Sequence, residues 1–200
     1  MKDPQLILHG LAIKKHGDAA EVAAITGLEV ARVQTGLDEA VAAGRAVKAG
    51  AKYMLTPVAQ IALRAAYSRD CAAERANPVM AQGYDEFEKI NTQLKQLITD
   101  WQTLPVGGAR IPNDHSDRDY DDKIIDRLGD LHDRAVPMLD RLASGLPRLK
   151  IYKDHLQRAL EKAEDGEIVW VSDARCASYH TVWFELHEDL IRVLDRQRIE

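Results

Sequence analysis

The sequence predicts a mainly α-helical protein in two parts: a helix-turn-helix that runs into a small β-hairpin, followed by an antiparallel four-helix bundle. Residues 18–57 hold two helical patterns separated by a glycine, and then two short strand patterns. The break at Asn77-Pro78 follows, since the residue before a proline is disfavoured in the helical region. Four long apolar stripes with helical spacing come after it. We therefore expect domains at residues 1–76 and 77–200.

The first expected domain begins with a helix over residues 6–16, with His9 and His16 at its surface or boundary. Asp18 is an N-cap for a short second helix, and Gly27 supplies the turn that ends it. A third helix over residues 29–43 has apolar positions three or four apart, which predicts one buried stripe. These positions are Val30, Val33, Leu37 and Val41.

A β-hairpin and a connecting helix complete this domain. Ala46-Val47 and the segment from Tyr53 to Leu55 read as short strands around a turn at Ala49-Gly50. Thr56-Pro57 then begins a helix over residues 57–76, with proline at a position where a missing N–H costs nothing. The whole arrangement is the winged-helix pattern.

Three short motifs resemble the winged-helix domains of bacterial regulators, particularly the MarR-like class. They are Ala23-x-x-Thr26-Gly27-Leu28, Leu37-x-x-Ala40 followed by Ala43-Gly44-Arg45, and Leu55-Thr56-Pro57-x-Ala59. In that class the last position is commonly Gly, so Ala59 departs from the pattern. The resemblance covers about a third of the chain and implies the family fold more firmly than its activity.

Candidate contacts to double-stranded DNA lie on the third helix and the hairpin. They are Arg32 and Thr35 on the outward side of the helix, and Arg45, Lys48 and Lys52 on the hairpin. Glu29, Asp38 and Glu39 share the helix and would repel the phosphate backbone. Both a DNA-binding use and a structural or protein-binding use of this fold are therefore open.

The second expected domain consists of helices over residues 79–103, 120–142 and 148–164, and a last helix from a cap at Ser172 or Asp173 to residue 196. Pro137 should bend the second of these helices. Residues 104–119 read as a loop, because they contain two prolines, a Gly-Gly pair and no period. Its acidic end lacks the Gly and the twelfth-position acid of a calcium loop, so we expect a helix cap and no metal site.

The last helix carries two stripes. One stripe should face the bundle core and comprises Tyr179, Val182, Trp183, Leu186, Leu190, Val193 and Leu194. The other comprises His180, Phe184, His187 and Ile191, and we expect it to lie in an interface with another subunit, helix or domain. The stretch 179–190 also resembles actinobacterial proteins related to phosphoenolpyruvate-utilising enzymes, which implies at most an accessory or partner role.

Composition narrows the function classes. The chain has 200 residues and a net charge of −5, which neither excludes DNA binding nor indicates it. Cys71 and Cys176 have no metal-ligand spacing, and no apolar run reaches the roughly 18 residues of a membrane span. We expect a cytoplasmic protein that is not an enzyme and needs no cofactor, because no Gly-rich phosphate loop or nucleophile motif is visible.

Two function hypotheses follow. The first is a DNA-binding transcriptional regulator whose helical domain dimerises or senses a ligand. The alternative is a non-catalytic interaction or accessory module, which binds a partner protein or a second copy and does not use DNA. A positive surface shared by the hairpin and the third helix would support the first, and acids projecting into that surface would support the second.

Overall fold

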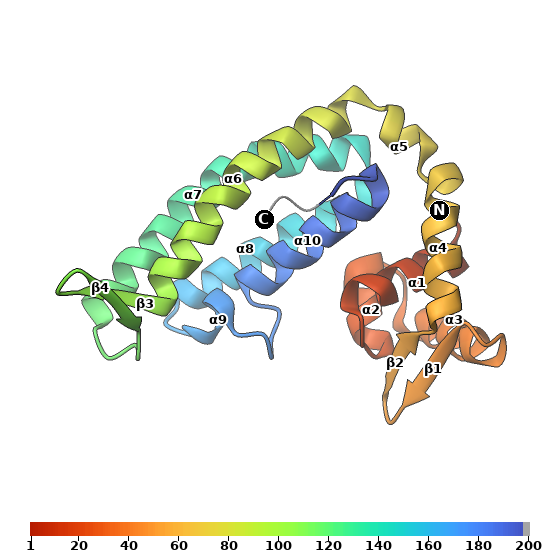
Figure 1. The fold of residues 1–200 in the computed structure, drawn as a ribbon, viewed down its shortest axis with the longest axis horizontal. Coiled ribbons are helices and arrows are strands. Elements are labelled where there is room, and N and C mark those ends of the chain that lie inside the picture. Colours follow the sequence, from red (N-terminus) through yellow and green to blue (C-terminus); the bar gives the residue numbers. More distant parts are fainter. Residues whose placement is uncertain (198–200) are drawn as a thin grey trace. The chain divides into compact units, whose positions relative to one another are not determined.

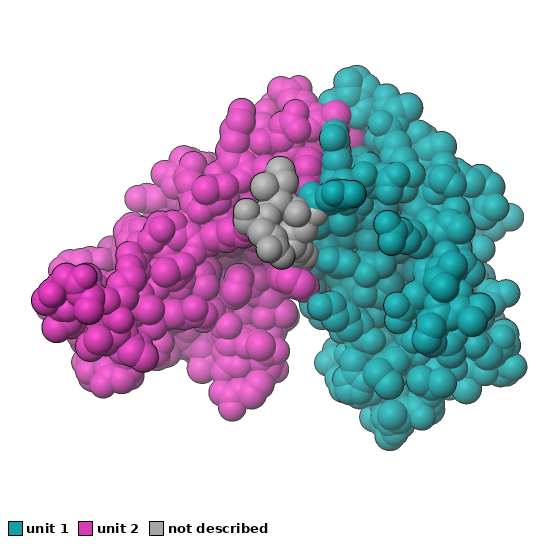
Figure 2. All heavy atoms as spheres, in the orientation of Figure 1, with its two compact units in different colours: residues 1–78, 185–200 teal, residues 79–184 magenta. Residues whose placement is uncertain are grey.

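The computed structural model of the protein describes residues 1–197 and confirms that the chain is mainly α-helical, with two small antiparallel hairpins (Figure 1). It divides into two compact units (Figure 2). Unit 1 comprises residues 1–78 and the residues from Glu185 on, and unit 2 comprises residues 79–184. The last helix thus contributes its second half to unit 1, whereas the sequence suggested that it belongs wholly to the second part.

Unit 1 is built from five helices, one hairpin and the second half of α10 (Tyr179–Leu194). In chain order its elements are α1 (Asp3–Lys14), α2 (Ala19–Thr26), α3 (Val30–Ala42), β1 (Ala46–Ala49), β2 (Lys52–Leu55), α4 (Pro57–Asp70) and α5 (Ala72–Ala76). The hairpin pairs Ala46 with Leu55 and Ala49 with Lys52, so Gly50 and the next residue form its turn. The helix expected over residues 57–76 is interrupted at Cys71, whose φ of −120° leaves the helical region.

The buried stripe of α3 is rotated from the expected one. Val33 and Leu37 are fully buried, and Ala40 is 6% exposed, whereas Val30 is 49% exposed. At about 100° per residue, the centre of the buried arc lies between Val33 and Leu37, and Val30 falls outside it. The inclusion of Val30 in the buried stripe was therefore wrong.

Unit 2 contains three long helices, a second hairpin, a short helix and the first turns of α10. Its elements are α6 (Pro78–Gln102), β3 (Thr103–Val106), β4 (Ala109–Pro112), α7 (Arg118–Gly145), a 3₁₀ turn (Pro147–Leu149), α8 (Lys150–Glu164) and α9 (Val169–Ser172). Three polar contacts join α6 to α7 in antiparallel register, namely Glu86 with Arg141, Gln93 with Arg134 and Asp100 with Arg127. Figure 1 shows these two helices running side by side.

The apolar stripes expected for unit 2 are buried. Met80, Phe87, Leu94 and Trp101 of α6 are at most 3% exposed. The Phe87 and Trp183 rings stack with centroids 4.8 Å apart, and the Trp183 indole donates a hydrogen bond to Asn91 at 3.1 Å. An aromatic pair therefore joins α6 to the first half of α10 in the core of unit 2.

Two local expectations in this unit were wrong. Residues 103–112 form a hairpin rather than an irregular loop, with Gly107 and Gly108 in its turn at φ +57° and +84°. The prolines are tolerated because both strands of a two-stranded hairpin are edge strands. The last helix begins at Tyr179 and is capped by Ser178, whose hydroxyl accepts a hydrogen bond from the Thr181 amide at 3.3 Å, and not by Ser172 or Asp173.

Within residues 1–197, no helix combines the length and the apolar character that crossing a membrane requires.

Candidate interaction surface

Helices α2 and α3 carry part of the surface that the sequence assigned to DNA. The Asp18 carboxylate accepts a hydrogen bond from the Glu21 amide at 2.9 Å, and Glu21 accepts one from the Asp18 amide at 2.8 Å. Asp18 is thus the N-cap, as predicted, and the reciprocal bond with Glu21, which was not predicted, completes a capping box at the start of α2. Gly27 ends the helix at φ +72°, as expected. Because α3 is held by its Val33 and Leu37 side, its opposite side faces the solvent.

The two predicted contacts on α3 are both exposed and both engaged within the chain. The Arg32 side chain is 65% exposed, and its guanidinium forms an ion pair with the carboxylate of Asp3 on α1. The Thr35 hydroxyl donates to the carbonyl oxygen of Ala31 at 3.1 Å. A phosphate group would have to compete with Asp3 for the charge of Arg32.

Lys48 on β1 lies beside a carboxylate of α3. Its Nζ is 3.9 Å from Asp38 Oδ1 and 5.0 Å from the centroid of the Tyr53 ring. Asp38 also accepts hydrogen bonds from the Gln34 amide at 2.8 Å and from the Tyr53 hydroxyl at 2.7 Å. These bonds, that of Gln34 first, hold the pKa of Asp38 below its usual value. Asp38 therefore stays ionised next to Lys48.

Lys52 on β2 is tied to the N-terminal cap of α2. Its ammonium forms an ion pair with Glu21 and lies 3.3 Å from Asp18 Oδ2. The hydrogen bond to Glu21 is the main cause of the raised pKa of Lys52. The side chain is only 31% exposed, so Lys52 joins the hairpin to α2 instead of projecting from it.

Arg45 and the outer face of the hairpin complete this surface. Arg45 is exposed, and no described residue forms an ion pair with it. Val47 and Met54 pair across the hairpin and are 46% and 38% exposed. The five predicted residues therefore lie on α3, on the hairpin or next to it. The sequence did not indicate the carboxylate partners of Arg32, Lys48 and Lys52, or the exposed apolar pair on the hairpin.

The predicted interface stripe on α10 is not uniformly exposed. His187 is 1% exposed, and burial lowers the pKa of His180, which is half-buried. Ile191 is half-buried too, whereas Phe184 is 37% exposed. The assignment of this stripe to an interface stays a prediction, and it now rests mainly on Phe184.

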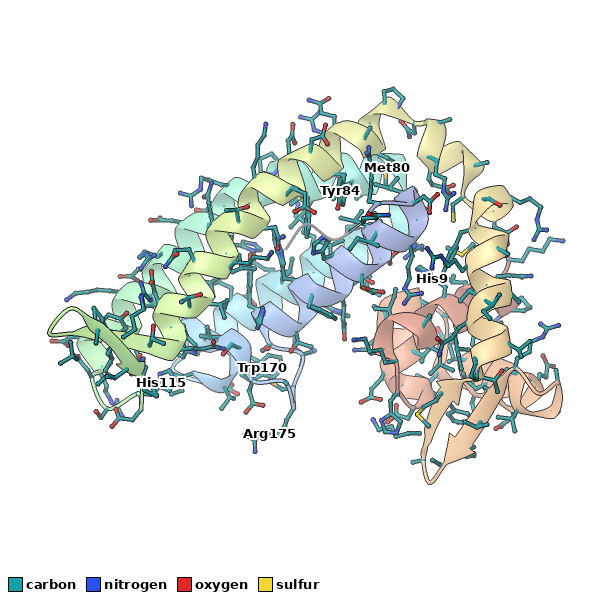
Figure 3. All side chains as sticks on the ribbon, viewed as in Figure 1. His9, Met80, Tyr84, His115, Trp170 and Arg175 are labelled. Atoms are coloured by element: carbon teal, nitrogen blue, oxygen red, sulfur yellow. The ribbon has the colours of Figure 1, made fainter. Side chains whose placement is uncertain are left out.

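His9 was expected near the surface, and this expectation was wrong. The ring is 1% exposed on α1, facing α4 (Figure 3). Its Nδ1 lies 2.8 Å from the Tyr67 hydroxyl and its Nε2 lies 3.0 Å from the Asp189 carboxylate. A ring with its proton on Nε2 satisfies both contacts, as donor to Asp189 and acceptor from Tyr67. No local feature of the sequence indicated this buried cluster, because Tyr67 and Asp189 are 58 and 180 residues from His9 along the chain.

The acidic segment before α7 forms a helix cap and a set of hydrogen bonds that hold the preceding loop against α7. Asp117 accepts a hydrogen bond from the Tyr120 amide, as the capping interpretation predicted. His115, in the loop after β4 (Figure 3), contacts the buried Asp121 carboxylate at 2.9 Å, and Asn113 donates to the same carboxylate at 2.8 Å. Among residues 1–197, no group of three or more His, Cys, Asp or Glu side chains is placed to hold a metal ion.

Comparisons with protein-family models, curated proteins and solved structures find no match for this chain.

Proposed function

We propose that this protein is a non-catalytic interaction module, in which a winged-helix N-terminal part is used for protein contacts instead of DNA and a helical bundle forms the rest. The observation that carries the proposal is the pairing of the surface cations. Arg32, Lys48 and Lys52 each have a carboxylate partner within unit 1. Arg45 alone among the four predicted basic contacts has none among the described residues.

These ion pairs weigh against DNA because affinity for duplex DNA comes largely from basic side chains that neutralise phosphates and so release the counterions condensed on the DNA. A lysine paired with Glu21 or Asp38 must give up that carboxylate before its charge can neutralise a phosphate. The exposed acids Glu29 and Glu39 on α3 add repulsion. Binding DNA would therefore require breaking contacts that the fold itself makes.

The apolar character of the hairpin also supports protein contacts. Val47 and Met54 form a cross-strand apolar pair on its outer face, where a DNA-binding wing would present polar groups to phosphates. Exposed apolar side chains that gather in one region mark protein interaction surfaces more often than nucleic-acid ones.

Binding to a random-sequence duplex tests the proposal. Fluorescence anisotropy with a labelled duplex should show no measurable binding by the wild type at about 50 mM or about 200 mM salt, the range over which phosphate contacts are most sensitive. Clear binding at the lower salt that weakens steeply at the higher salt would overturn the proposal.

The second candidate function is a DNA-binding transcriptional regulator. The exposure of Arg45 and the resemblance of residues 23–59 to MarR-like domains favour it. If this function is correct, replacing Lys48 and Lys52 by Ala should weaken binding to all duplex sequences alike. It should also lower the salt slope by roughly one unit per lost contact.

A partner of the module is suggested only by the resemblance of residues 179–190. We propose a phosphoenolpyruvate-utilising enzyme as the first partner to test, with this chain as an accessory subunit that performs no chemistry.

A further inference from the structure

Helix α4 is apolar on two opposite sides. Its inner side buries Ala59, Leu63 and Tyr67, each at most 6% exposed. At about 100° per residue, the opposite side begins with Val58 and Ile61 and continues with the exposed Ala62 and Ala65. Val58 is 76% and Ile61 71% exposed, which are the largest values for big apolar side chains among the described residues. Exposed apolar side chains that gather on one side of a helix mark an interaction surface.

A groove lies along one flank of this exposed side. Its volume is about 430 Å³, and its walls come from α4, α1 and the turn between α3 and β1. Small side chains, Ala43, Ala62 and Ala66, line it together with Leu8. Val58 lines the groove, and Ile61 lies one turn further along beside Val58 on the outer side of α4. One ligand could therefore fill the groove and cover both side chains.

Among residues 1–197, the one charged side chain that lines the groove is a cation, Arg45, and no carboxylate lines it. Other exposed cations lie outside the groove: Lys2 lines a neighbouring hollow with Gln5 and Asp70, and Arg64 lines another with Glu188 and Asp195. No ion pair joins Arg45 to another residue in the part of the chain that the structure describes. The charge of Arg45 is therefore available to an acidic partner.

We propose that the outer side of α4 and its groove dock an amphipathic helix from a partner protein, with acidic residues beside its apolar stripe. This inference rests on the proposed interaction function and names its docking surface. The exposed strip from Val58 to Ala65 spans about 10 Å, or two helical turns, and suits apolar anchors at i, i+3, i+4 and i+7. A second copy of the chain fits less well, because its groove presents the same cation, Arg45, and no carboxylate from the described residues.

A synthetic helical peptide serves as the probe. It is a labelled peptide of about 16 residues with Leu at i, i+3, i+4 and i+7 positions and Glu at most others, which follows the spacing of helix-in-groove ligands. The matched peptide has Lys in place of each Glu. The full-length protein should bind the acidic peptide and not the basic one, as measured by fluorescence anisotropy.

Two variants locate the contact. Ile61→Glu and Arg45→Glu should each lower the affinity for the acidic peptide roughly tenfold or more, because each places a carboxylate against the acids of the peptide. The matched control is Ile111→Glu on β4, where Ile111 is 43% exposed and lies in unit 2. It should leave the affinity unchanged, and all variants should keep the helical circular dichroism of the wild type.

Several results would overturn the inference. They are equal binding of both peptides, no binding of the acidic one, or unchanged affinity after Ile61→Glu. Binding to vesicles of phosphatidylglycerol that Ile61→Glu abolishes would point to a lipid surface instead, and a dimer that Ile61→Glu dissociates would make a second copy the occupant.

The test also separates this inference from the proposed function. If Val47→Glu and not Ile61→Glu removes peptide binding, the interaction module stands and the α4 docking surface is wrong. Duplex DNA binding would instead count against the proposed function itself.

Discussion

His9 and Asp189 are 180 residues apart in the chain and form a buried pair in unit 1, with exposed fractions of 1% and 0%. A buried carboxylate is costly unless hydrogen bonds compensate it. His9 supplies one of these bonds and joins α1 to α10, while its other ring nitrogen contacts Tyr67 of α4. A single ring therefore links three helices of unit 1.

Replacing His9 by Leu should destabilise the protein by about 3–5 kcal/mol, because Asp189 would lose a partner in a buried site. The free energy of unfolding, measured by urea denaturation, checks this expectation. The control is His16→Leu, since His16 is exposed. It should change stability by no more than about 0.5 kcal/mol. If both variants lost the same free energy of unfolding, the His9 cluster would make no specific contribution to stability.

His132 provides a prediction about pH. Burial lowers the pKa of this ring, which contacts the Tyr179 hydroxyl at 3.2 Å and the Gln157 side chain at 3.0 Å. Because the pKa of His132 in the folded protein lies below the usual histidine value of about 6.5, the unfolded chain binds more protons as the pH falls through that value. The stability linked to His132 is thus present at neutral pH and lost toward pH 5.

Urea denaturation at several values between pH 7 and pH 5 measures this dependence. Replacing His132 by Gln, which keeps hydrogen-bonding groups but does not titrate, should reduce the slope of stability against pH. It should not abolish the slope, because burial also lowers the pKa of His180. An unchanged slope in the variant would contradict the assignment.

At the scale of single elements, periodic apolar patterns predicted most of the helices. The stripes of α6, α7 and α8 are buried where the spacing placed them, because packing of an amphipathic helix depends on that spacing. The β3–β4 hairpin was missed because Pro105 and Pro112 argue against a strand unless both strands are edges. The N-cap of α10 was assigned wrongly because Ser172 and Asp173 suit an N-cap chemically as well as Ser178 does. The sequence does not show that Ser172 ends the separate helix α9.

The candidate surface was predictable in its residues but not in its electrostatics. Residue type and spacing located Arg32, Arg45, Lys48 and Lys52 on α3 and the hairpin. The carboxylates that pair with Arg32, Lys52 and Lys48 come from α1, α2 and α3, and a sequence pattern does not show which side chains meet in space. The exposure of Ile61 was not predicted either. Apolar residues lie on both sides of α4, and the pattern does not tell which side is buried.

Two glycines within helices give a matched prediction. A Cβ on Gly83 of α6 would lie 2.7 Å from Cδ2 of the buried Leu142 of α7, whereas a Cβ on Gly129 of α7 would meet only Glu164 Oε1 at 3.4 Å. Gly83→Ala should therefore destabilise the protein by about 1–3 kcal/mol through overpacking. Gly129→Ala should stabilise it by about 0.5–1 kcal/mol through helix propensity. Thermal unfolding compares the two variants. A raised unfolding temperature in both would show that α6 and α7 can move apart without loss of stability.

At the scale of the whole molecule, α10 connects the two units because its halves belong to different cores. In unit 1, its second half supplies Asp189 to His9 and Glu185 to Lys14, and Arg75 donates to the Val193 carbonyl at 2.9 Å. A fragment of residues 1–78 lacks all three contacts. The N-terminal segment should therefore not be an independent folding unit.

We expect the fragment of residues 1–78 to lack the near-ultraviolet circular dichroism of a packed core. Adding a synthetic peptide of residues 179–197 should restore part of this signal, because it returns the contacts of Asp189 and Glu185. A fragment that shows a native-like signal alone, with no response to the peptide, would demonstrate that α10 is dispensable for unit 1.

Carboxylates within unit 1 pair with Arg32, Lys48 and Lys52, and we propose that this pairing keeps the protein from binding DNA. Glu21→Gln combined with Asp38→Asn removes the partner of Lys48 and one of the two carboxylate partners of Lys52, since Asp18 remains. The variant keeps hydrogen-bonding side chains at the α2 cap and beside Tyr53. The charge-matched control is Asp154→Asn with Glu161→Gln, both exposed on α8.

Anisotropy of a labelled random duplex at about 50 mM salt, where phosphate contacts are strongest, measures the consequence most directly. We predict no binding by the wild type and the control, and salt-dependent binding by the Glu21→Gln, Asp38→Asn variant. Wild-type binding as tight as that of the variant would contradict this prediction.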